Sequence, residues 1–139
     1  LSETAIGSLY RALFAQLKND VWADRVYADV APPDAQKPFV VFYLSGGGDV
    51  DGTVSGVHMR LLVSVVCVAD DLLSAFSGGY RIRSLLDDAG SQDHNPRLAP
   101  TTWDILTISA GISIHQRYGV DGVPEFQHGF DFTIRMQTR

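Results

Sequence analysis

The strongest structural signal in this sequence is a strict alternation near the carboxyl end, in EFQHGFDFTIRMQTR (residues 125–139). Every second residue from Phe126 to Met136 is apolar or aromatic, and the residues between them are polar or glycine. Period-two alternation predicts a β-strand with one buried face and one polar face. The chain must therefore build a sheet and cover one side of it. The question that remains is what the polar side meets.

Further segments complete a simple order of elements. A stripe of apolar residues spaced three and four apart predicts a helix over 2–19. A second helix is expected from Asp70-Asp71 to about Asp88, weakened and open to a kink at Gly78-Gly79. Besides the last strand, strands are predicted at 25–30, 39–44, 57–69 and 103–115. FVVFYL (39–44) is continuous in β-branched and aromatic residues, which predicts a central strand buried on both faces.

The order helix, strand, strand, strand, helix, strand, strand predicts an α+β fold. We expect a mainly antiparallel or mixed sheet of about five strands, with both helices packed on one face. Three connections are expected to be loops: the glycine- and aspartate-rich 45–56, which is too long for a tight hairpin turn, and 89–101 and 116–124. The length of 139 residues suits one domain spanning 1–139.

Composition narrows the class of protein. Apolar residues make up 45% of the chain, which argues against disorder. A net charge of −5 argues against a generally basic nucleic-acid surface, but not against an acidic channel through which DNA slides. The lone Cys67 lies in an apolar run and is expected to be a buried hydrophobe. With no signal-peptide pattern and no apolar stretch of membrane-spanning length, we expect a protein made in a reducing cytoplasm, away from membranes.

Motifs that would carry chemistry are weak. GGGDVDG lacks the Lys-Ser/Thr ending of a phosphate-binding loop. DVDG resembles the start of a calcium loop, but its twelfth position, counted from Asp49, is Arg60 where a glutamate is needed. No GxSxG elbow supports a nucleophilic serine. We therefore expect a protein that is not an enzyme and has no cofactor.

The remaining histidine, arginine and aspartate residues show no pattern that indicates a catalytic or metal site. The histidines at 58, 94, 115 and 128 lack metal-binding spacing, so no metal is expected, although three of them lie on predicted strands and could approach one another. Arg81 and Arg83 point to different sides of their helix, which suits salt bridges between subunits or plain solvation. We expect Asp87-Asp88 to form a solvent-exposed helix terminus.

The segment DRVYADVAPPDAQKPFVVFYL (24–44) resembles part of the tail completion, or tail terminator, proteins of long-tailed bacteriophages. The resemblance rests on Arg25-Val26-Tyr27, Ala31-Pro32 and Pro38-Phe39-Val40-Val41, in that order. It continues through the long strand 57–69, the helix after it, Tyr118 and HGFDFTIR (128–135). The glycine pair in the second helix and the glycine-rich loop depart from the pattern.

The resemblance implies a structural protein of the virion tail, at the junction of tail and neck, assembled in the host cytoplasm. Such proteins form a ring, usually of six copies, that ends the tail tube and joins it to the head connector or stopper. The expected partners are other copies of the chain, the tail tube protein and the connector, while DNA passes through without specific binding. A head-side neck adaptor or stopper and a generic α+β binding module are the alternatives.

Two groups of residues are candidates for these contacts. A ring needs several different surfaces on one small domain, and binding concentrates on loops held by a scaffold. Gly47, Asp49, Val50, Asp51 and Tyr118 are therefore candidate subunit or partner contacts. The polar side of the last strand, with Gln127, Asp131 and Arg135, is the candidate lining of the channel; plain exposure to water is the alternative.

Overall fold

The computed structural model describes residues 5–18, 20–53, 56–87, 103–120 and 123–138. Within these ranges the elements follow the predicted order, which is confirmed. They are helix α1 (Ala5–Lys18), strands β1 (Val26–Ala28), β2 (Phe39–Thr53) and β3 (Gly56–Ala69), helix α2 (Leu72–Leu86), and strands β4 (Trp103–Val120) and β5 (Val123–Thr138).

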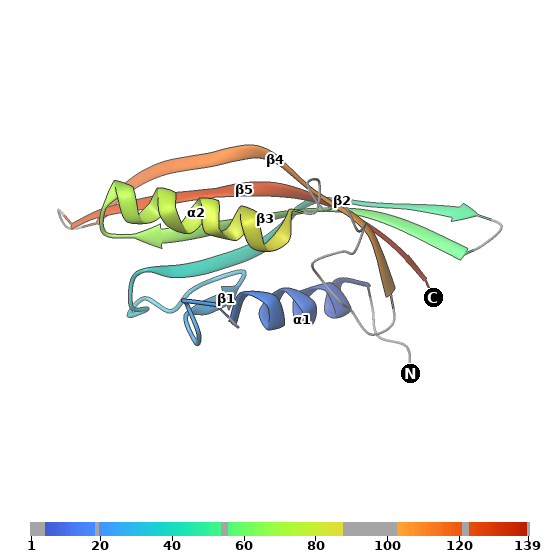
Figure 1. Cartoon of the computed structure of the whole chain (residues 1–139), viewed down its shortest axis with the longest axis horizontal. Coiled ribbons are helices and arrows are strands. Elements are labelled where there is room, and N and C mark those ends of the chain that lie inside the picture. Colours follow the sequence, from blue (N-terminus) through green and yellow to red (C-terminus); the bar gives the residue numbers. More distant parts are fainter. Residues whose placement is uncertain (1–4, 19, 54–55, 88–102, 121–122, 139) are drawn as a thin grey trace.

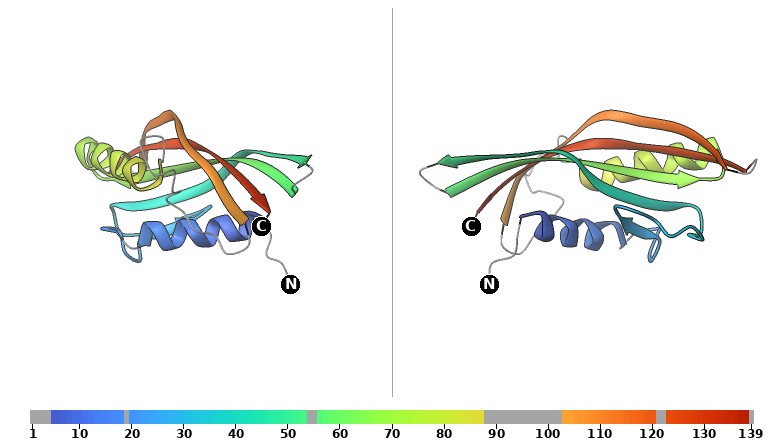
Figure 2. Two further views of the ribbon diagram at one scale, coloured as in Figure 1. Left: turned by 45° about the vertical axis from the view of Figure 1, so that its right-hand side comes forward. Right: turned by 180° about the vertical axis from the view of Figure 1, so that it is seen from behind.

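The strands form one mixed sheet, as predicted. Its spatial order is β1-β2-β3-β5-β4. The short β1 is parallel to β2, and the other three neighbouring pairs are antiparallel. The sheet is therefore two long hairpins, β2–β3 and β4–β5, joined where β3 lies beside β5. Both helices pack on the same face of the sheet, and no helix of the described residues lies on the other face (Figures 1 and 2).

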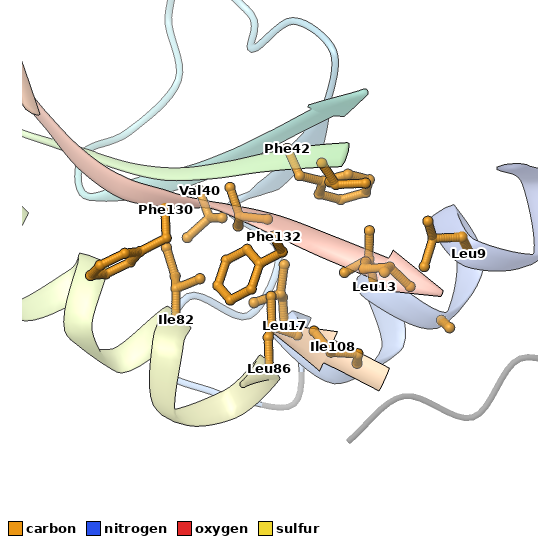
Figure 3. Close-up of a cluster of buried hydrophobic side chains, with 14 of the residues drawn as sticks. Leu9, Leu13, Leu17, Val40, Phe42, Ile82, Leu86, Ile108, Phe130 and Phe132 are labelled. Atoms are coloured by element: carbon orange, nitrogen blue, oxygen red, sulfur yellow. The ribbon is translucent and has the colours of Figure 1, made fainter. Parts of the chain in front are cut away.

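The side chains of β5 are buried at every second position, as the sequence alternation predicts. His128, Phe130, Phe132, Ile134 and Met136 are each at most 4% exposed. They pack against apolar side chains of both helices, and Phe132 lies at the centre of the cluster (Figure 3). The same cluster contains Leu61, Val63, Val65 and Cys67 from β3, Leu9, Leu13 and Leu17 from α1, and Ile82 and Leu86 from α2.

Strand β2 was expected to be buried on both faces, and this is only partly correct. Val40 and Phe42 are fully buried under α1, where the Phe42 ring contacts Tyr10 and Phe14 edge-on at centroid distances of 5.0 and 4.9 Å. Tyr43 and Leu44 are 36% and 37% exposed. The strand leaves the body of the protein soon after Phe42, so its later residues have less structure to cover them.

The prediction of a loop over 45–56 is wrong. β2 continues to Thr53 and β3 begins at Gly56, with Thr53 paired to Gly56. Irregularities between Leu44 and Gly46 and between Gly47 and Asp49 absorb the residues that do not fit a regular ladder. Glycine and aspartate have low strand propensity, but here the apolar β3 supplies a continuous partner strand. The result is a long hairpin that extends past both helices (Figures 1 and 2).

The connection expected at 116–124 is likewise mostly strand. β4 runs to Val120 and β5 starts at Val123, and Tyr118 is paired with Glu125. Sequence patterning missed this because turn-forming glycines flank the paired residues. The loop predicted at 89–101 lies outside the described residues.

The expectation of a weakened or kinked second helix is also corrected. α2 is one continuous helix that begins after an N-cap, Asp71, whose carboxylate accepts from the Ser74 amide at 2.8 Å. Gly78 and Gly79 are both buried where the helix lies against the sheet. A Cβ at position 78 would lie 2.7 Å from Cys67 Cβ, and one at position 79 would lie 2.8 Å from His128 Cε1. The glycines therefore allow close packing of helix on sheet.

Arg81, for which salt bridges between subunits or plain solvation are expected from the sequence, instead makes an ion pair within the chain. Its Nε and Nη2 donate to the two carboxylate oxygens of Asp20 at 2.7 and 3.0 Å. The pair joins the turn after α1 to the middle of α2. Arg83, in turn, contacts Asp87 at the end of its own helix, with Nε 3.4 Å from Oδ2.

This ion pair predicts a dependence of stability on pH. The hydrogen bonds from Arg81 hold the pKa of Asp20 below its ordinary value of 3.8. Since the folded-state pKa is the lower one, the stabilisation is complete above pH 3.8 and is lost as the pH falls through the folded-state pKa. Urea unfolding between pH 2 and 6 is expected to show a smaller loss of stability in acid for Asp20→Asn than for the wild type. Asp34→Asn, on the exposed link, is the control, and equal acid dependence in wild type and Asp20→Asn would contradict the assignment.

Candidate assembly surface

The face of the sheet without helices is the surface to which the predicted channel residues belong. We call it the open face and define it by Tyr43, Arg60, Leu62, Ser64, Ser109, Gln127, Asp131, Thr133 and Arg135. These residues alternate with core residues along each strand, and none belongs to the core cluster under the helices. Alternation in 103–115 predicts that Thr107, Ser109 and Ser113 share this face with the polar residues of β5. Thr107 and Ser109 are paired with Arg135 and Thr133, as expected, whereas Ser113 is paired with the core residue Phe130, because an irregularity between Ala110 and Ser113 shifts the register of β4.

A polar row occupies the distal half of the open face. Ser64 donates a hydrogen bond from Oγ to Asp131 Oδ1 across the β3–β5 pair. Further along the same two strands, beyond the Leu62–Thr133 pair, Arg60 lies opposite Arg135, and both are exposed. The row thus combines charges of both signs, with its arginines exposed to solvent. The hydrogen bond from Ser64 holds the Asp131 side chain in place.

The other half of the open face is covered by the link between β1 and β2. Phe39, Val66 and Val68 are at most 7% exposed although they face away from the helices. Lys37 ties the link down, with Nζ 3.3 Å from Glu125 Oε2 and 3.5 Å from Asp70 Oδ1. A cavity of about 470 Å³ remains between link and sheet, and Gln127 lines it.

The three predicted channel residues therefore separate into two settings. Asp131 and Arg135 belong to the polar row, while Gln127 lies half-buried beside the link. Sequence alternation assigned all three to one face correctly. It gave no sign that the proline-containing link folds back over part of that face.

The predicted contact residues lie at two opposite ends of the sheet. Gly47, Asp49, Val50 and Asp51 are in the distal part of β2, where Asp49 is paired with Arg60. Tyr118 is near the end of β4, paired with Glu125 at the start of β5. The structure therefore does not bring them together as one site.

An apolar cavity on the helical side was missed by sequence reasoning. It has a volume of about 410 Å³ and lies between α2 and the turn after α1. Val21 and Leu73 at its rim are 66% and 80% exposed, and the buried Trp22 forms part of its wall. The available signal was the Leu72-Leu73 pair at the start of α2, since adjacent helical residues cannot both face the core.

Two potentially reactive side chains, Cys67 and Asp71, lie in settings that explain their shifted pKa values. Burial raises the pKa of the Cys67 thiol to about 11, so the thiol is protonated at neutral pH. Asp71 has a lowered pKa because it accepts hydrogen bonds from the Ser74 amide and hydroxyl, as a helix cap does. His115 is paired with His128 across β4 and β5, while His58 pairs with Gln137 at the far end.

The described residues hold neither a metal-binding cluster nor a membrane-spanning helix. They contain no group of three or more His, Cys, Asp or Glu side chains placed to hold a metal ion. In the same ranges, no helix combines the length and apolar character needed to cross a bilayer.

Comparison with solved structures gives a similarity in fold. The chain superposes on a protein chain from the virion of a native gene transfer agent particle with a TM-score of 0.71. The match covers 98% of this chain and 99% of that chain, at 16% sequence identity. No protein-family model matches the sequence. No curated protein matches it either.

Proposed function

We propose that this chain is a structural protein of a phage-like particle, which forms a ring at the head-proximal end of the tail tube, ends the tube and joins it to the head connector. The observation that carries the proposal is the shared fold, over nearly the full length of both chains, with a protein of a gene transfer agent virion. The residues that resemble tail terminator proteins add the specific position in the particle. A ring of six copies follows from that resemblance.

The arrangement of layers supports a ring built around the open face. Copies that repeat head to tail around an axis close into a ring when the rotation per copy divides the circle. With both helices on one side of the sheet, a copy can turn its helices outward and its open face toward the axis. The distal hairpin and the end of β4 that holds Tyr118 are then available to neighbouring copies, the tube and the connector.

In this arrangement the polar row borders the central opening. Asp131 and Arg135 give it charges of both signs, with Arg60 beside them. A strongly basic lumen would hold DNA by releasing counterions from its phosphates. A mixed row in a chain of net charge −5 gains little from that release, so DNA passes without being retained. Electron microscopy of the ring would contradict this part of the proposal if Asp131 and Arg135 lay on the outer rim.

The test of the function uses the full chain and a shortened hairpin. Residues 51–58 are replaced by Asn-Gly, a two-residue turn that closes the ladder at the paired Val50 and Met59. The variant keeps every residue of the core cluster. We expect it to fold with thermal stability near that of the wild type, and to fail to form rings or to join tails to heads.

Native mass spectrometry and negative-stain microscopy of terminator-depleted tails provide the readout. The wild-type chain should give a closed ring and restore tails of uniform length with heads attached. Capture by the purified connector and not by the tail tube would identify a neck adaptor in place of a terminator. A monomeric wild-type chain that neither caps tails nor binds either partner would overturn the proposal.

A further inference from the structure

We infer that Tyr10 sets the direction in which the distal hairpin leaves the body of the protein, and so positions that hairpin for assembly. The distal hairpin is defined here as residues 46–53 of β2 with residues 56–62 of β3. It extends past both helices, so its direction depends on how β2 is held at its base (Figure 1). The inference rests on the proposed function, which gives the hairpin its role in assembly.

The outer side of β2 is bonded to the short β1 as far as Phe42. The Val40 amide donates to the Arg25 carbonyl at 2.9 Å, and the Phe42 carbonyl accepts from the Asp29 amide at 2.8 Å. The next group on that side is the Leu44 amide, which a longer β1 would bond through the Asp29 carbonyl. Asp29, however, has a φ of 66°, a left-handed conformation that takes the chain out of the strand. The ladder between β1 and β2 therefore ends one bond short of the hairpin.

The Tyr10 hydroxyl of α1 supplies the missing bond. It accepts from the Leu44 amide at 3.2 Å and donates to Asp29 Oδ1 at 3.0 Å. Burial and the hydrogen bond to Asp29 raise the pKa of Tyr10 above its ordinary value of 10.0, so the hydroxyl keeps its proton at neutral pH. The Tyr10 ring packs edge-on against Phe42, with the ring centroids 5.0 Å apart. One side chain thus joins α1, the end of β1 and β2 at the base of the hairpin.

The strand is easily bent directly after this contact. On β3 the base of the hairpin is held by the fully buried Leu61, whereas residues 43–45 of β2 are exposed. Ser45 is left out of the ladder between β2 and β3, and its hydroxyl donates to the Leu62 carbonyl at 3.2 Å. An extra residue of this kind bends a strand. The glycines at 46–48 follow, and they have no side chains to limit the bending.

The direction of the hairpin matters for assembly because a segment held in place beforehand loses less conformational freedom when copies join. Without the Tyr10 hydroxyl, the Leu44 amide would bond to water instead. The hairpin would then sample a wider range of directions, and each contact it makes with a neighbouring copy or partner would cost more free energy. Tyr10 is therefore a positioning residue, which acts on assembly through the hairpin.

Tyr10→Phe in the full chain tests the inference, because it removes the hydroxyl and keeps the ring. Hydrogen exchange of the Leu44 amide, followed by NMR, should become about tenfold faster, while that of the Phe42 amide stays unchanged. Spin labels on Thr53→Cys and Ser84→Cys measure the hairpin against α2, and their distance distribution should become wider. By native mass spectrometry, the concentration at which half of the chains are in rings should rise at least about fivefold.

Matched variants separate this effect from a general loss of stability. Tyr27→Phe removes a hydroxyl from β1, where the ring contacts Phe39, and should change none of the three measurements. Asp29→Gly keeps the left-handed backbone but removes the carboxylate, so it should act in the same direction as Tyr10→Phe. Asp29→Asn, which keeps an acceptor oxygen and tolerates the same backbone, should restore most of that loss.

The outcomes for the inference and for the proposed function are distinguishable. Unchanged exchange at Leu44 with an unchanged distance distribution in Tyr10→Phe would overturn the inference and leave the proposed function standing. A wider distribution with rings formed at the wild-type concentration would also overturn it. A wild-type chain that forms no ring would contradict the proposed function, and the exchange and spin-label measurements would still decide whether Tyr10 holds the hairpin.

Discussion

Gly129→Ala is expected to lower the free energy of unfolding by about 4 kcal/mol, more than a typical overpacking substitution. Gly129 lies in β5 opposite Val66 of β3. A Cβ at this position would overlap the Val65 carbonyl oxygen and lie 2.6 Å from Val66 Cα. These are backbone atoms in the middle of the sheet, so no side-chain rotation can relieve the overlap. The two hairpins would have to separate where β3 meets β5.

A second glycine provides the control for this prediction. Gly46 also lies in a strand, and a Cβ there would lie 3.4 Å from Leu62 Cδ1, at the edge of ordinary van der Waals contact. Gly46→Ala should change the free energy of unfolding by less than about 1 kcal/mol. Urea unfolding followed by circular dichroism measures both variants. Similar values for Gly129→Ala and Gly46→Ala would show that the strands can part at little cost and would contradict the prediction.

The fold was predictable because burial follows periodicity in this chain. Alternation in β5 identified the core residues Phe132 and Ile134, and the three-and-four spacing in α1 identified Leu13. What could not be predicted was the extent of the hairpins. Glycine and aspartate in 45–53 have low intrinsic strand propensity, and only the partner strand β3 makes them part of the sheet. Propensity describes a residue alone, whereas a ladder is a property of two segments.

For the candidate surface, the sequence predicted which side chains share a face but not which segments cover or contact them. Alternation placed Asp131 and Arg135 on one face, because a strand fixes the direction of its side chains. It could not foresee the covering link over Gln127, the ion pair of Asp20 with Arg81, or the apolar cavity beside Leu73. Each of these joins segments that are far apart in sequence, and no local pattern records them.

For the Gly78-Gly79 pair, too, the local sequence and the contacts in the structure lead to opposite expectations. This difference is the basis of the second large prediction. In the sequence these residues only weaken a helix, so alanine at position 79 would be expected to stabilise it by about 1 kcal/mol. In the structure, a Cβ at Gly79 would overlap His128 Nδ1 and lie 2.8 Å from Cε1. His128 is 2% exposed, and its ring packs against those of Phe76 and Tyr80 at centroid distances of 4.3 and 5.3 Å. The ring therefore has little room to move.

We expect Gly79→Ala to lower the free energy of unfolding by about 2 kcal/mol, because overpacking of about 3 kcal/mol outweighs the gain in helix propensity. His128→Ala removes every atom that the new methyl group would meet first. In that background, Gly79→Ala should become stabilising by up to about 1 kcal/mol. A double-mutant cycle by urea unfolding measures the coupling, expected near 3 kcal/mol. If Gly79→Ala has the same effect with and without the imidazole, α2 does not owe its close approach to the sheet to this glycine.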